Sequence, residues 1–152
     1  MKATLFLRIA SVLTLIHALL HTIGGVFGKT PPNVQPVVTA MQENRFLAMG
    51  VMRTMWDFHM GLGLVASVSL TVEGLVFWQL GTLAKSDALR LRPILATFLV
   101  GYLCISMISY RYFFAGPVIT ELLIAICLGM AIASAKEAAA VRHVAVESRG
   151  LS

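Results

Sequence analysis

Charged residues are scarce in this sequence. Only 12% of its 152 residues are Asp, Glu, Lys or Arg, whereas 58% are hydrophobic. Soluble domains carry about twice that share of charge, and a chain this short has too small an interior to keep so many apolar side chains away from water. The composition therefore excludes a water-soluble globular protein and predicts a protein that is solvated by lipid.

Acidic residues, cysteines and catalytic motifs are also few. The 12 Lys and Arg outnumber the 7 Asp and Glu, but they form short clusters between apolar runs, so we expect no nucleic-acid partner. The 2 cysteines lie in separate apolar runs without Cys-x-x-Cys spacing, which predicts inert thiols. No glycine-rich phosphate loop and no nucleophile elbow is found, so the sequence leaves open whether the protein is an enzyme.

Long hydrophobic runs are what the sequence has in abundance. Four of them, over residues 3–28, 56–83, 91–114 and 117–135, are long enough to cross about 30 Å of hydrocarbon as helices. The first run exceeds the roughly 7–15 apolar residues of a signal-peptide core and contains Arg8, so we expect it to be retained. The sequence therefore predicts an all-α fold, a four-helix transmembrane bundle that forms one integral membrane domain over residues 1–152.

The connection between the first two runs is long. It opens with Lys-Thr-Pro-Pro-Asn at residues 29–33, and its prolines end the first helix. Beyond Pro36, apolar residues recur at roughly helical spacing as far as Met55. This pattern predicts an interfacial helix in the headgroup plane, with a loop packed over the mouth of the bundle as the alternative.

The distribution of basic residues predicts the orientation. Eight of the 12 Lys and Arg lie on the side of the two termini, and four lie on the other side. Because cytoplasmic loops carry the excess of Lys and Arg, we predict a bacterial inner-membrane protein with both termini and the tail over residues 136–152 in the cytoplasm. The expected partners are the lipid bilayer and, in one alternative, other membrane subunits.

Ionisable side chains inside spans indicate function, because each costs about 2.5–3.5 kcal/mol to insert at mid-helix. With the termini inside, all of them except Glu73 fall in the outer half of the spans. The outer-half residues are His17, His21, Asp57, His59, Arg111 and Glu121. We predict that these residues surround a pocket for a lipid or small hydrophobic molecule, with His21 and Asp57 at its core. Glu73 either bonds a serine such as Ser69 or lines a pocket.

Structural roles are the alternatives for the same side chains. Asp57 and Glu121 lie near helix starts, where the helix dipole favours anions. Arg111 is placed to pair with Glu121. His17 and His21 share a helix face and can donate hydrogen bonds to a neighbouring helix.

Metal binding and acid–base chemistry are further alternatives. His17, His21, His59 and Glu121 offer a tetrahedral, zinc-like set for a divalent metal. A haem would need His59 with one of the other two histidines, and it is the weaker cofactor hypothesis. The same side chains could act as acid, base or donor around a lipid-like substrate. The rival class of function is a small structural or accessory subunit of a larger membrane complex, since small-residue helix faces and a basic tail suit docking.

Three segments resemble a known family. They are Leu-Arg-Ile-Ala-Ser at residues 7–11, Leu-Leu-His-Thr-Ile-Gly-Gly at 19–25 and Met-Arg-Thr-Met-Trp-Asp-Phe-His-Met-Gly-Leu-Gly at 52–63. They resemble an uncharacterised family of small bacterial four-helix inner-membrane proteins, known chiefly from genome annotation and including leptospiral members. The resemblance implies four spans and assigns no function. The matching segments contain His21, Arg53, Trp56 and Asp57. His17 lies outside them, and His59 stands at a position of the segment 52–63 that the shared pattern does not fix.

Overall fold

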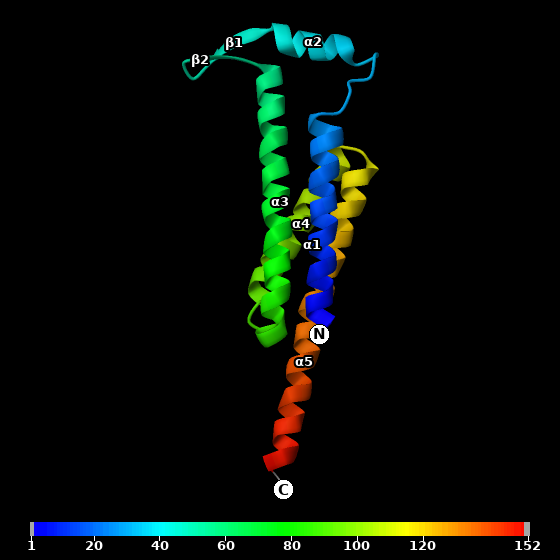
Figure 1. Ribbon diagram of the computed structural model, residues 1–152, viewed down its shortest axis with the longest axis vertical. Coiled ribbons are helices and arrows are strands. Elements are labelled where there is room, and N and C mark those ends of the chain that lie inside the picture. Colours follow the sequence, from blue (N-terminus) through cyan, green and yellow to red (C-terminus); the bar gives the residue numbers. More distant parts are fainter. Residues whose placement is uncertain (1, 151–152) are drawn as a thin grey trace. The chain divides into compact units, whose positions relative to one another are not determined.

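The computed structural model describes residues 2–150, with side chains described as far as residue 135. Its regular secondary structure is helical except for one short hairpin, which confirms the predicted all-α class (Figure 1). In chain order the elements are α1 (Lys2–Leu20), the π-helical turn η1 (His21–Val26), α2 (Gln35–Glu43), β1 (Arg45–Ala48), β2 (Val51–Thr54), α3 (Met55–Asp87), α4 (Arg92–Tyr112) and α5 (Ala115–Gly150).

Four helical segments are long and apolar enough to cross a membrane: Lys2–Val26, Met55–Asp87, Arg92–Tyr112 and Ala115–Ala135. They coincide with the four predicted spans to within a few residues. Large apolar side chains are exposed on them, such as Leu62 at 70% and Met107 at 72%, as lipid-facing helices require. The chain is therefore a multi-pass membrane protein. The side chains of the predicted tail over residues 136–152 lie outside the described residues.

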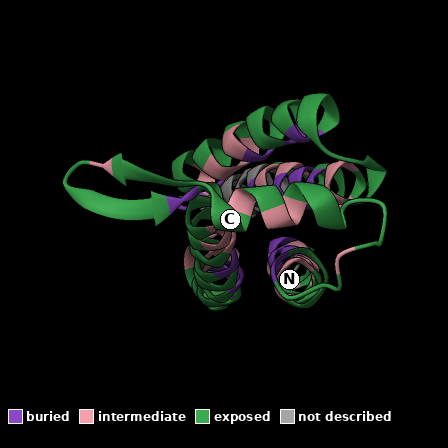
Figure 2. Ribbon diagram, turned by 90° about the horizontal axis from the view of Figure 1, so that it is seen from above, coloured by how far each residue is buried: buried purple, intermediate pink, exposed green. Residues whose placement is uncertain are grey.

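The connection between α1 and α3 differs from its prediction. Helix α2 covers only the first part, and β1 and β2 pair antiparallel in a register that sets Arg45 opposite Thr54. Met49 and Gly50 have φ values of 49° and 87°, the left-handed conformations of a two-residue type I′ turn. The predicted helix as far as Met55 is thus wrong beyond α2, because this turn lets the flanking residues pair as strands. The hairpin is exposed along most of its length (Figure 2).

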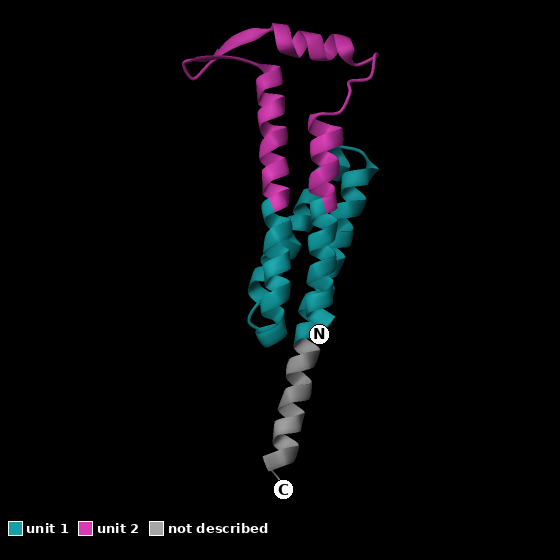
Figure 3. Cartoon of the chain, viewed as in Figure 1, with its two compact units in different colours: residues 1–15, 72–152 teal, residues 16–71 magenta. Residues whose placement is uncertain are grey.

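The described chain consists of two compact units (Figure 3). Unit 1 covers residues 1–15 and 72–152, which are the first part of α1, the last part of α3, α4 and α5. Unit 2 covers residues 16–71, which are the end of α1, η1, α2, the hairpin and the first part of α3. Both units therefore contain parts of α1 and α3.

The core of unit 1 is built around an aromatic cluster. The side chains of Leu7, Phe77 and Leu128 are 0% exposed, and Tyr102 is 2% exposed. The ring of Phe77 lies 5.0 Å from that of Phe98 in an edge-to-face arrangement, and 6.0 Å from that of Tyr102. Such aromatic pairs contribute about 0.5–1.5 kcal/mol beyond the area they bury. This cluster fixes α3 against α4.

Helices α1 and α3 approach closely within unit 1 at Gly74. A Cβ atom at that position would lie 2.7 Å from two side-chain atoms of Leu15. The Ser11 hydroxyl donates a hydrogen bond of 2.7 Å to the Gly74 carbonyl oxygen. Because lipid tails are as apolar as leucine, helices in membranes associate mainly through such close packing and hydrogen bonds. Gly74 is therefore a packing position that a larger residue cannot occupy without a shift.

Candidate functional site

The predicted site residues fall in both units. His17, His21, Asp57 and His59 belong to unit 2, and Arg111 and Glu121 belong to unit 1. Glu121 is the most buried of the six, with 4% of its surface exposed. The residues of each unit are therefore described separately. The hydrogen bonds of some of them indicate a structural role.

Glu121 combines deep burial with an incomplete set of hydrogen bonds. It lies near the start of α5, and its Oε1 atom accepts a hydrogen bond of 2.8 Å from the Ser109 hydroxyl of α4. Its Oε2 atom is buried and has no hydrogen-bond partner. A buried acceptor without a donor costs about 1–3 kcal/mol. This carboxyl group therefore keeps hydrogen-bonding capacity that the described part of the chain does not use.

Arg111 does not pair with Glu121, so the predicted structural pair is wrong. Its side chain is exposed, and its guanidinium carbon lies 5.6 Å from the ring centroid of Tyr112. Among the side chains that the structure describes, Arg111 makes no ion pair. The reason is helical geometry. Ser109 is on the buried face of α4, and a residue two positions further lies about 200° around the helix, on the outside.

The two histidines of unit 2 differ in their hydrogen bonding. His21 begins the π-helical turn, and its Nε2 atom donates to the Gly63 carbonyl oxygen of α3 over 3.1 Å. This bond supports the structural alternative, in which the histidine holds two helices together. His17 is half-buried, and its Nδ1 atom is buried without a partner. His17, which the resemblance does not include, is thus the histidine with unused hydrogen-bonding capacity.

Asp57 caps helix α3. Its Oδ2 atom accepts a hydrogen bond of 2.8 Å from the Thr54 backbone N–H, and its own N–H donates to the Thr54 hydroxyl over 3.1 Å. This reciprocal pair is a capping box, with Asp in the position that Glu or Gln usually takes. The described hydrogen bonds of Asp57 and of His21 thus go to different partners, Thr54 and Gly63. The pairing of His21 with Asp57 as the core of a pocket stays a prediction.

The capping role makes a testable prediction. We expect Asp57→Ala to destabilise the first turn of α3 by about 1 kcal/mol, because the Thr54 backbone N–H loses the carboxylate oxygen that accepts its hydrogen bond. Hydrogen exchange measured by mass spectrometry over residues 55–60 should then accelerate about fivefold. His59→Ala is the control, because His59 lies in the same region and makes no capping bond. Unchanged exchange in Asp57→Ala would contradict the capping role.

His59 is exposed, and its ring lies 5.3 Å from that of Trp56, one turn earlier on the same helix. Within the part of the chain whose side chains are described, no three side chains of His, Cys, Asp or Glu are grouped as a metal ion requires. The zinc-like set of His17, His21, His59 and Glu121 therefore lacks geometric support. It stays a prediction, as does the haem hypothesis.

Sequence reasoning missed Tyr102 as the partner of Glu73. The Tyr102 hydroxyl donates a hydrogen bond of 2.7 Å to Oε2 of Glu73, so the partner is this tyrosine on α4 and not Ser69. Tyr102, Ser106 and Ser109 are all buried, at 2%, 5% and 4% exposure. Their spacing of about one helical turn on the third span is the signal in the sequence that indicates a polar face on α4.

No protein-family model, no curated protein and no solved structure matches this chain. The resemblance to small bacterial four-helix inner-membrane proteins therefore stays a prediction. The function has to be argued from the residues themselves.

Proposed function

We propose that this multi-pass membrane protein binds a lipid or another small hydrophobic molecule at polar side chains in the outer-leaflet half of its spans. The carboxyl group of Glu121 is the observation that carries the proposal. It is buried in an apolar helix and uses one oxygen for Ser109, while its second oxygen is buried without a donor. A titratable group inside a span is costly to keep, and a bound molecule with a polar head would offset that cost.

The chemistry of the side chains narrows the class of ligand. Glu121 offers an acceptor, so the ligand should carry a hydroxyl, amide or ammonium donor. Residues 122–132 of α5, which follow Glu121, are apolar, and Leu122, Leu123 and Ile126 among them are exposed. A molecule with one polar end and a hydrophobic body therefore fits best.

A thermal-shift screen tests this proposal. We expect the detergent-purified protein to be stabilised by at least one member of a panel of phospholipids, sterols and quinones, because ligands that bind only the folded state raise its stability. Divalent metals belong in the same panel. Stabilisation by a metal alone would support the zinc-like alternative, and stabilisation by no member of the panel would contradict ligand binding.

We also propose that the protein lies in a bacterial inner membrane with both termini in the cytoplasm. The proposal is supported by the excess of Lys and Arg on the side of the termini. Arg8 agrees with it. Its guanidinium carbon lies 3.5 Å from the centroid of the Trp78 ring, and its Nη2 atom donates to the Thr82 hydroxyl over 2.8 Å. The positive charge is thus held towards the end of α3 that precedes the α3–α4 turn.

Cysteine labelling tests the orientation. Single substitutions Asn33→Cys and Ala88→Cys are made after Cys104 and Cys127 are replaced, and intact cells are treated with an impermeant maleimide. We expect labelling at position 33 and none at position 88. The reverse pattern would place Glu121 in the cytoplasmic half and exclude a periplasmic ligand.

The hairpin favours a second candidate function, a subunit of a larger membrane complex. Leu47 is 68% exposed, Met49 103% and Met52 48%, and all three lie outside the candidate spans. Exposed apolar residues of this kind suit contact with another protein.

Purification in mild detergent distinguishes the subunit from the ligand-binding protein. A stoichiometric partner retained through size exclusion, and lost in Leu47→Ser/Met49→Ser, would support the subunit.

A further inference from the structure

A groove of about 440 Å³ lies at the α3–α4 turn in unit 1, apart from the six candidate site residues. Its lining comes from the turn, the first turns of α4, and one residue of α5: Leu89, Arg92, Pro93, Ala96 and Ile132. The groove is open to the surface of the protein. Four of the five lining residues are apolar, so the groove suits a hydrocarbon chain with one charged group at its end.

Arg92 supplies the charged group. It is half-buried, and its Nε atom is buried without a hydrogen-bond partner. A guanidinium group has only donors and is always protonated, so Arg92, which has no acceptor at Nε among the described residues, favours an anionic one. Arg92 is also the first residue of α4, whose N-terminus has no side-chain cap. The positive end of the helix dipole therefore adds to the attraction for an anion.

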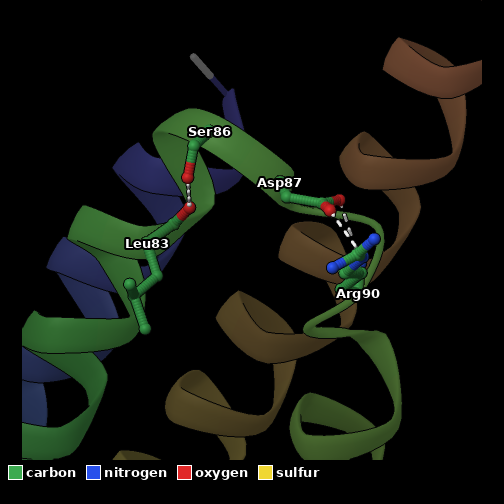
Figure 4. Close-up of polar contacts among 4 residues, drawn as sticks. All are labelled: Leu83, Ser86, Asp87 and Arg90. Carbon is green, nitrogen blue, oxygen red and sulfur yellow. Dashed lines mark hydrogen bonds and ion pairs between the residues drawn. The ribbon is translucent and has the colours of Figure 1, made fainter.

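Among the side chains that the structure describes, no acidic group pairs with Arg92. The acidic residue of the turn, Asp87, is engaged by Arg90, with 2.9 Å between Nε and Oδ2 (Figure 4). Ser86, also in this region, donates its hydroxyl to the Leu83 carbonyl oxygen at 2.9 Å (Figure 4). Arg90 is thus neutralised by its own partner, and Arg92 has no such partner among the described side chains. The two arginines of one turn form a natural matched pair for an experiment.

The position of the groove along the candidate spans indicates which kind of ligand it can meet. α3 ends at Asp87 and α4 begins at Arg92, so the groove lies where two candidate spans end and lipid headgroups begin. Ala96 and Ile132 lie further into their spans than Arg92 does, on the hydrocarbon side. We propose that the groove binds an anionic phospholipid. The phosphate contacts the Arg92 guanidinium, and one acyl chain packs on Leu89, Ala96 and Ile132.

Native mass spectrometry of the delipidated full chain tests this site. The protein is titrated with dioleoyl-phosphatidylglycerol and with dioleoyl-phosphatidylcholine, which share acyl chains and differ in net charge. We expect a preference for phosphatidylglycerol, and we expect Arg92→Gln to weaken its binding about tenfold, as the loss of a charged hydrogen bond does. Arg90→Gln removes the same charge from the same turn and should change binding by no more than about twofold.

A second variant tests the apolar half of the groove. Ala96→Phe fills the groove without changing charge, and it should weaken phosphatidylglycerol binding while leaving the size-exclusion profile unchanged. Glycerol 3-phosphate, which has the headgroup chemistry without acyl chains, should not displace the bound lipid. Equal binding of the two lipids, equal losses in Arg92→Gln and Arg90→Gln, full binding by Ala96→Phe, or displacement by glycerol 3-phosphate would each overturn the proposal.

Discussion

Replacing Gly74 by leucine is expected to cause a large loss of stability in unit 1. Even the first added atom would lie 2.7 Å from two atoms of Leu15, which is well inside van der Waals contact. Overpacking of this kind costs about 1–3 kcal/mol, and separating α1 from α3 would also break the bond from Ser11 to the Gly74 carbonyl. We expect the unfolding temperature in detergent, followed by circular dichroism, to fall by more than about 5 °C.

Gly101→Leu is the matched control. It makes the same substitution inside the spanning helix α4, where an added Cβ meets no atom within 4 Å. Its unfolding temperature should stay within about 2 °C of that of the unchanged protein. Gly74→Ala is an intermediate variant in case Gly74→Leu cannot be purified. Equal stability of Gly74→Leu and Gly101→Leu would show that α1 and α3 do not pack as described.

Replacing Glu121 by leucine is expected to have the largest effect on ligand retention. Leucine keeps an apolar side chain of similar size on α5 but removes the oxygen that has no partner within the chain. Loss of a hydrogen bond at a buried group costs about 1–3 kcal/mol, so retention should fall at least about fivefold. Hydrophobic molecules that stay with the protein through size exclusion are extracted and quantified by mass spectrometry.

Ser109→Ala separates ligand binding from helix packing. It removes the hydroxyl that donates to Oε1 of Glu121 but leaves the carboxyl group in place. We therefore expect the variant to lose some stability and to retain the ligand within about threefold, since a neutral hydrogen bond contributes only about 1 kcal/mol. If Ser109→Ala and Glu121→Leu lose the ligand equally, the carboxyl group acts only by packing α5 against α4.

The spans were predictable from the sequence because they depend on length and composition. Apolar runs long enough to cross hydrocarbon and the prolines near helix starts, such as Pro93 and Pro117, are local signals. The hairpin was not predicted, because Met49 in a left-handed conformation is unusual for a side chain of its size. Apolar residues in the connection fit a helix as well as a strand, and only Gly50 hinted at the turn.

The sequence predicted which side chains belong to the candidate site, but it did not predict their hydrogen-bond partners. Intramembrane Glu121 and His17 were found because ionisable groups in spans are rare. Their hydrogen bonds depend on how far each helix is rotated towards its neighbour, which a single sequence does not contain. This is why Arg111 was expected beside Glu121 although Ser109 holds that place, and why Tyr102 was not expected beside Glu73.

Native mass spectrometry of the unmodified protein, released from mild detergent, tests the proposed function most directly. We expect a chain that carries one hydrophobic molecule of defined mass, bound in a stoichiometric ratio. Collisional activation should release that molecule and leave the bare chain. A chain that carries no small molecule and holds a second protein in fixed stoichiometry would contradict ligand binding and identify a subunit of a larger complex.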